Sequence, residues 1–124
     1  MNKVFVYGTL KTGGAIRGLD SFGTSTIVGK ATTQYPDFDM ADLGAFPAVT
    51  AGEKYISGEV WEVDDDTLEH LDAIEGYPNF YNRKQVDTTQ GRAWMYYIAD
   101  VRDFKRNKES SSITDHDDVL TWRN

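Results

Sequence analysis

One glutamate stands where its carboxyl group is suited to proton transfer. The apolar spacing after residues 64–66 predicts a helix that runs to about Glu75, and each helical residue advances about 100° around the axis. Measured from Leu68, Leu71 lies at about −60° and Glu75 at about −20°, so Glu75 shares the apolar stripe. Burial and the negative end of the helix dipole both disfavour a carboxylate and raise its pKa. A glutamate whose pKa is raised in this way is suited to general acid–base catalysis near neutral pH.

A solvated Glu75 is the open alternative. Gly76 is a natural helix stop, and Pro78 follows it closely. Because last turns fray, a glutamate there can also curl into solvent beside the terminating glycine. Its carboxyl group would then keep an ordinary pKa and carry no chemistry.

The second candidate site is the run Tyr7, Gly8, Thr9 and Leu10. It follows a β-branched and aromatic segment at residues 4–7, which is typical of a central strand covered on both faces. Glycine directly after such a strand predicts a tight turn whose backbone N–H groups can bind a carboxylate or a developing oxyanion. An ordinary strand-to-loop junction has the same pattern, so both interpretations stay open.

Aromatic residues near the predicted helix end are further candidates. The hydroxyl group of Tyr81 can orient a substrate or Glu75, although simple packing of its ring on the sheet is the alternative. Phe46, Phe80 and Trp94 are side chains on which the size of a pocket would depend.

Other chemistries are poorly supported. The chain has no cysteine, which excludes disulfides, thiolate nucleophiles and thiolate metal sites. His116 lies in a linear acidic run at residues 115–118, and such a run is more typical of a solvated turn than of a metal site with convergent ligands. The serines at 110–112 lack a Gly-x-Ser-x-Gly context, and no phosphate-binding Gly-Lys-Ser/Thr motif occurs. We therefore expect no metal site.

The sequence predicts that the candidate site residues are positioned mostly by β-strands. Asp64, Asp65 and Asp66 supply candidate helix N-caps, and Asp66 with Glu69 resembles a capping box. A short helical turn is expected within residues 15–22, and the tail from 102 onward is expected to be loop with one ordered piece near 119–122. The remaining extended segments are predicted at residues 4–7, 26–33, 38–40, the end of 43–49, 56–63, 80–86 and 92–101, the last two forming a hairpin. The sum is an α+β fold with a predominantly β, partly closed sheet.

Length and charge narrow the class of protein. At 124 residues the chain fits one domain, residues 1–124. A formal charge of −7 argues against binding along nucleic-acid phosphates and against a polybasic membrane patch. The apolar run at the N-terminus is too short for a signal peptide, and no stretch approaches the ~20 apolar residues of a membrane helix. We expect a cytoplasmic protein without nucleic-acid or membrane partners, and the sequence does not indicate an oligomeric state.

Four segments, in order, carry a resemblance to a known family. The segments are residues 4–11, 43–49, 58–77, and 81–83 with 91–97. They resemble the opening signature, the glycine–aromatic–proline loop, the strand–helix unit and the last hairpin of the γ-glutamylcyclotransferase-like (AIG2-like) family, which includes γ-glutamylamine cyclotransferases and small bacterial relatives. The resemblance covers residues 4 to about 99.

The resemblance implies a fold and an activity. The fold is a six-stranded, barrel-like mixed sheet with flanking short helices and a cavity between residues 7–10 and Glu75. The reaction is cyclisation of a γ-glutamyl group to 5-oxoproline with release of an amine or amino acid. Glu75 moves the proton, the main chain of Tyr7, Gly8, Thr9 and Leu10 holds the glutamyl end, and the only partner is a small γ-glutamyl substrate. No cofactor is needed.

Departures from the family pattern keep two other functions open. Residues 11–27 are short and glycine-rich and lack the Asn/His-containing stretch of many relatives, and residues 113–118 stand where small bacterial relatives often have Gly-Asp-Trp. Some relatives also lack the glutamate, so the fold alone does not guarantee activity. A non-catalytic binding module for a small ligand or a protein is one alternative, and a structural β protein with a solvated Glu75 is the other.

Overall fold

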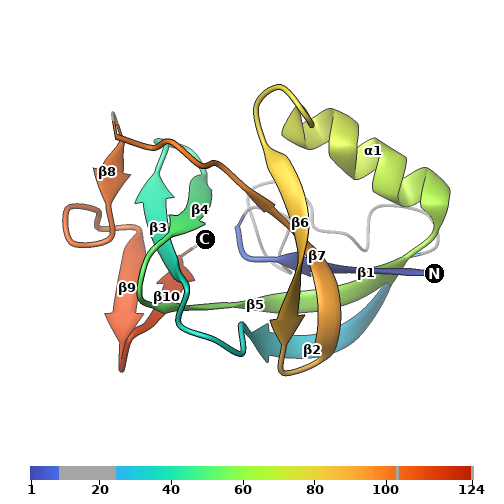
Figure 1. Ribbon diagram of the computed structural model, residues 1–124, viewed down its shortest axis with the longest axis horizontal. Coiled ribbons are helices and arrows are strands. Elements are labelled where there is room, and N and C mark those ends of the chain that lie inside the picture. The colour runs from blue at the N-terminus through green and yellow to red at the C-terminus, as the bar shows by residue number, and fades with distance from the viewer. Residues whose placement is uncertain (9–24, 103, 124) are drawn as a thin grey trace.

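Ten strands and one helix make up the part of the chain that the computed structural model describes, residues 1–8, 25–102 and 104–123 (Figure 1). The predicted helical turn at 15–22 lies outside these residues. The elements are β1 (Asn2–Val6), β2 (Thr26–Thr32), β3 (Phe38–Asp42), β4 (Pro47–Ala51), β5 (Tyr55–Val63), α1 (Asp65–Glu75), β6 (Asn82–Thr88), β7 (Gly91–Tyr97), β8 (Lys105–Arg106), β9 (Ile113–His116) and β10 (Val119–Trp122).

The main sheet is mixed and curled. Six strands follow one hydrogen-bonded path, β6-β7-β1-β5-β10-β9, and β2 joins as a seventh strand by pairing with β5 off this path. The pairs β1–β7 and β5–β10 are parallel, whereas β1–β5, β2–β5 and β6–β7 are antiparallel. A second sheet of three strands, β4-β3-β8, lies beside it (Figure 1). These features confirm the predicted α+β class with a predominantly β, mixed and partly closed sheet.

β1 is the central strand that its apolar sequence predicts. It lies between β5 and β7, and its side chains alternate between two buried clusters. Val4 and Val6 pack on the side of α1, together with Leu71, whereas Phe5 and Tyr7 pack in the cluster on the opposite face. The end of β1 is thereby held rigidly from both sides.

The helix ends where the sequence predicts, and its N-cap is one of the three predicted candidates. Asp64 is the N-cap, since its carboxylate accepts a hydrogen bond of 2.8 Å from the backbone N–H of Thr67. The predicted capping box led by Asp66 is therefore wrong, because Asp66 already lies in the first turn. Gly76 ends the helix in the left-handed conformation with φ of 67°, which glycine adopts without steric cost.

The prediction of a mostly irregular tail is also wrong. β8 pairs with β3, and β9 pairs with β10, which itself runs parallel to β5. Leu120 is fully buried in the core, so the ordered piece predicted near residues 119–122 is confirmed as β10. β8 and β10 pair with strands far away in the sequence, which no local pattern marks, and this is why composition suggested a loop.

Candidate functional site

A cavity of about 160 Å³ opens where the ends of β1 and α1 meet the start of β4 and the segment before β6. Most of its wall is apolar or aromatic, as is usual for a small-molecule site. The described residues that line it are Phe5, Val6, Tyr7, Gly8, Phe46, Pro47, Ile74, Glu75, Phe80, Tyr81 and Tyr96. It brings together four of the predicted site residues, Tyr7, Gly8, Glu75 and Tyr81. Phe46 and Phe80, two of the side chains on which the size of a pocket was expected to depend, line it as well.

Glu75 is the last residue of α1 and reaches the cavity from the helix face that packs on the sheet. Leu71 and Thr67, one and two turns earlier, are buried on that face. The carboxyl-bearing side chain is itself half-buried in the cavity wall. The helical phase predicted for Glu75 is therefore confirmed, and the alternative of a fully solvated side chain is not what the structure shows.

Burial governs the electrostatics of the site. Loss of solvation raises the pKa of Glu75 from 4.5 to about 7. Among the described residues no Lys, Arg or His lies within ion-pair distance of its carboxylate. A carboxyl group with this pKa is present in both protonation states near neutral pH, so it can both accept and donate a proton.

The hydroxyl group of Tyr7 is used inside the fold. It donates to the backbone oxygen of Tyr96 at 2.8 Å and accepts from the N–H of Val49 at 3.2 Å. Burial, followed by the nearby Tyr81 and Glu75, raises its pKa well above the ordinary value, so it stays protonated. The side chain thus ties the end of β1 to β7 and β4.

Tyr81 forms another part of the cavity wall. Its hydroxyl group donates to the backbone oxygen of Pro47 at 2.6 Å, and its ring meets that of Phe80 edge to face at 5.1 Å between centroids. Burial and the charge of Glu75 raise its pKa, so this hydroxyl also stays protonated. Its oxygen keeps the capacity to accept a further hydrogen bond.

Gly8 lies at a close approach between β1 and β4. A Cβ atom at this position would lie 2.9 Å from both Cδ and Cγ of Pro47. The absence of a side chain therefore lets the end of β1 meet the start of β4 at the cavity wall. Thr9 and Leu10, the other two predicted contacts, lie outside the described residues.

Sequence reasoning missed a polar network behind the site. Oδ1 of Asp72 accepts a hydrogen bond of 2.7 Å from the hydroxyl of Tyr96 and lies 3.0 Å from Nε of Arg83 in an ion pair. The guanidinium of Arg83 is held between the rings of Tyr77 and Trp94, at 4.7 and 4.3 Å from their centroids. Trp94 thus supports the network instead of lining the cavity. No local pattern signals these contacts, because the partners come from α1, β6 and β7.

Comparison with known proteins places the chain in a family. The sequence profile described as "Gamma-glutamyl cyclotransferase, AIG2-like" matches residues 4–123. The chain belongs to this family. The resemblance of the four sequence segments and the fold expected from it are thereby confirmed.

Family relatives cover most of the chain. A Vibrio cholerae protein with a provisional γ-glutamylcyclotransferase name is 39% identical over 93 residues, which span 75% of this chain and 78% of the relative. The γ-glutamylcyclotransferase family protein YtfP of Escherichia coli is 29% identical over 116 residues, covering 93% of this chain and 98% of its own. The crystal structure of an AIG2-like protein from mouse superposes with a TM-score of 0.74 at 25% identity, covering 100% of this chain and 96% of the mouse chain.

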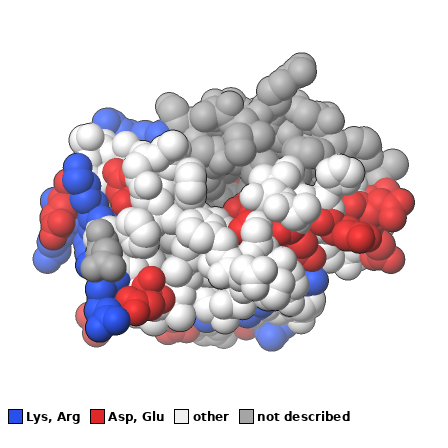
Figure 2. Space-filling model, turned by 90° about the horizontal axis from the view of Figure 1, so that it is seen from above, with Lys and Arg blue, Asp and Glu red and all other residues white. Residues whose placement is uncertain are grey.

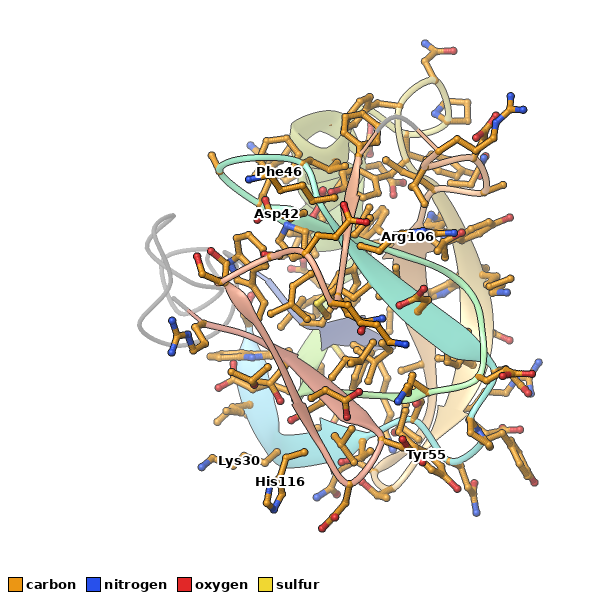
Figure 3. All side chains as sticks on the ribbon, turned by 90° about the vertical axis from the view of Figure 1, so that its left-hand side faces the viewer. Lys30, Asp42, Phe46, Tyr55, Arg106 and His116 are labelled. Carbon is orange, nitrogen blue, oxygen red and sulfur yellow. The ribbon has the colours of Figure 1, made fainter. Side chains whose placement is uncertain are left out.

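The acidic run near the C-terminus lies away from this cavity. Figure 3 shows His116 at the opposite end of the molecule from Phe46, which lines the cavity. Asp115 and Asp118 pair with Lys54 at 2.8 and 2.7 Å, and the run forms the end of β9 and the turn into β10. Within the described part of the chain no three His, Asp or Glu side chains cluster as metal ligands. No described helix is long and apolar enough to cross a membrane.

Proposed function

We propose that this family member is a γ-glutamyl cyclotransferase that converts a γ-glutamyl amine or γ-glutamyl peptide into 5-oxoproline and a free amine or amino acid. The observation that carries the proposal is the half-buried carboxyl group of Glu75, with a pKa of about 7, in the wall of a small cavity at the end of β1. Glu75 is the proposed general acid–base residue.

The proposed reaction needs one group that accepts a proton and then returns it. The substrate's α-amino nitrogen, in its neutral form, attacks the γ-carbonyl carbon, and the carboxylate of Glu75 takes a proton from that nitrogen. The oxyanion intermediate then collapses, the bond from the γ-carbon to the leaving nitrogen breaks, and Glu75 returns its proton to the leaving nitrogen. Because the attack is intramolecular, holding the substrate in a bent conformation supplies much of the rate.

The remaining predicted residues are assigned to substrate binding. The main chain of Tyr7 and Gly8, continued by Thr9 and Leu10, is proposed to hold the glutamyl end at the close of β1. Support for this comes from the position of Tyr7 and Gly8 in the cavity wall, and from the usual use of backbone N–H groups beside a glycine in anion binding. Tyr81 is proposed to orient the substrate through its hydroxyl oxygen.

The reaction as written requires no metal, thiol or organic cofactor, and its only partner is the small γ-glutamyl substrate. We propose that it takes place in the cytoplasm.

A non-catalytic binding module is the second candidate function. The observation that favours it is that the hydroxyl protons of Tyr7 and Tyr81 are both donated to backbone carbonyls. Within the described wall Glu75 would then be the principal polar group that meets a ligand. Such a module would bind a γ-glutamyl compound saturably without turnover.

A panel assay separates the two functions. The purified wild-type protein and a Glu75→Gln variant are each incubated with γ-glutamyl amines, γ-glutamyl dipeptides and glutathione. The formation of 5-oxoproline is measured for both proteins. Product from the wild type alone supports the proposed reaction and residue. Equal product from both proteins would exclude Glu75 as the acid–base group, and saturable binding without product would favour the binding module.

A further inference from the structure

The cavity is graded from a buried inner end to an exposed apolar rim. Phe5, Tyr81 and Tyr96 are almost completely buried at the inner end. At the outer end Phe46, Ile74 and Phe80 line the same cavity, yet they are 36%, 43% and 49% exposed. Large apolar side chains that stay exposed around a cavity are typical of a ligand-binding surface.

The two phenylalanines of the rim come from separate loops and are held against each other. Phe46 precedes β4, and Phe80 lies between α1 and β6. Their rings meet edge to face, with centroids 6.3 Å apart and planes at 76°, and Phe80 also meets the buried Tyr81 edge to face. This geometry is a favourable one for aromatic pairs, so the rim is organised before a ligand arrives.

Charge around the cavity disfavours an anionic group at the rim. Glu75 is the one Asp, Glu, Lys or Arg among the described lining residues. Figure 2 shows acidic side chains gathered over the α1 end and a largely uncharged surface beside them. Asp72, which precedes Glu75 by three residues on α1, is already bonded to Arg83 and Tyr96, so its carboxylate offers little to a cationic group.

We propose that Phe46 and Phe80 are specificity-determining residues that bind the leaving group, and that this group carries an aliphatic or aromatic side chain. The inference rests on the proposed function, which puts the scissile amide beside Glu75 and the glutamyl end at Tyr7 and Gly8. The leaving group must then extend toward the outer end. Covering the two exposed rings removes apolar surface from water, which a small or charged leaving group cannot do.

The leaving group can be an amino acid or an amine, since both can carry the same apolar side chain. γ-Glutamylleucine and γ-glutamylisoamylamine differ only by the leaving group's carboxylate. Comparing them therefore shows whether the leaving group is an amino acid or an amine. The acidic surface leads us to expect the amine to be the better of the pair.

The test compares kcat/KM for 5-oxoproline formation across a matched series. We expect γ-glutamylleucine and γ-glutamylphenylalanine to exceed γ-glutamylalanine and γ-glutamylglutamate by about tenfold or more. Phe80→Ala and Phe46→Ala should each reduce this preference to within about threefold, whereas Phe80→Leu should retain most of it. Phe104→Ala is the matched control, because Phe104 is 38% exposed but does not line the cavity.

A binding arm separates this inference from the proposed reaction. Glu75→Gln protein, with and without Phe80→Ala, is titrated calorimetrically with γ-glutamylleucine and γ-glutamylalanine. Turnover with equal kcat/KM for all leaving groups, or a preference that survives both alanine variants, overturns the inference and leaves the reaction standing. If there is no turnover, but γ-glutamylleucine binds better than γ-glutamylalanine and Phe80→Ala abolishes this preference, the proposed reaction is overturned and the binding role of the rim residues is supported. If the protein shows no turnover and no binding, both the proposed reaction and this inference are overturned.

Discussion

The hydroxyl group of Tyr96 donates a 2.7 Å hydrogen bond to Oδ1 of Asp72 and so joins β7 to α1. Asp72 lies about one helical turn before Glu75, and Tyr96 itself lines the cavity. The bond therefore connects the wall of the cavity to the helix that carries the proposed acid–base residue. Burial and the bond to Asp72 raise the pKa of Tyr96, which keeps the hydroxyl protonated as a donor.

Removing the charge of Asp72 should loosen this connection. Asp72→Asn leaves an oxygen for Tyr96 but breaks the ion pair with Arg83, which is mostly shielded from solvent. We expect a loss of about 1–3 kcal/mol in the free energy of unfolding and a lower kcat with little change in KM. Chemical denaturation and steady-state kinetics measure these effects. Asp87→Asn, which breaks an exposed ion pair with Arg92, is the control, and an equal effect there would contradict a special role for Asp72.

Glu75→Gln should make the protein more stable above neutral pH while abolishing activity. The folded-state pKa of Glu75 is about 7, above the ordinary 4.5, so the folded state binds the proton more tightly than the unfolded state. The stabilising effect of the protonated group is complete below pH 4.5 and is lost as the pH rises to about 7. Denaturation at pH 5 and pH 8 should show a steeper fall in stability for the wild type, by roughly 2–3 kcal/mol. Identical pH profiles would show that Glu75 is not held in a desolvating site.

The same pKa predicts the shape of the pH–rate profile. In the proposed reaction Glu75 must begin as a carboxylate and the substrate's amino group must be neutral, so kcat/KM should rise with pH through one ionisation with a midpoint near 7, from Glu75, and a separate one from the substrate's amino group. The midpoint should be found with every substrate, because it belongs to the free enzyme. A limb centred near pH 4.5, the ordinary value, would contradict this role.

Gly8→Ala should affect the site more than the fold. The added Cβ would meet the ring of Pro47 at 2.9 Å and push the end of β1 from β4. We expect a loss of about 1–2 kcal/mol in stability and an increase in KM of about tenfold. Gly58→Ala is the contrasting variant, since its Cβ would lie 2.3 Å from the backbone oxygen of Val6. That clash with backbone should cost more in unfolding free energy, and the opposite order would refute the placement of Gly8.

Tyr81→Phe should raise KM and reduce stability. It deletes the hydrogen bond to the oxygen of Pro47, which is then left without its donor at the cavity wall. We expect a loss of about 1–2 kcal/mol in the free energy of unfolding. Unchanged kinetics would assign Tyr81 to packing alone. Tyr35→Phe, an exposed tyrosine away from this cavity, serves as the control.

Local sequence was enough to determine the parts of this protein that depend on short-range physics. Gly76 stops the helix because its left-handed conformation is accessible to glycine, and the helical repeat places Glu75 on the packed face. The apolar run at β1 predicted a strand covered on both faces, and the turn at Gly91 predicted the β6–β7 hairpin. The ordered motifs were also sufficient to identify the family.

Only the tertiary structure decided which distant groups meet. The pairing of β10 with β5, the ion pair of Asp72 with Arg83 and the contact of Phe46 with Phe80 each join segments that no local pattern relates. The use of the Tyr7 hydroxyl between two backbone groups is likewise invisible in the sequence. The raised pKa of Glu75 also depends on these contacts, because desolvation is produced by all the elements that close around a group and not by the helix that carries it.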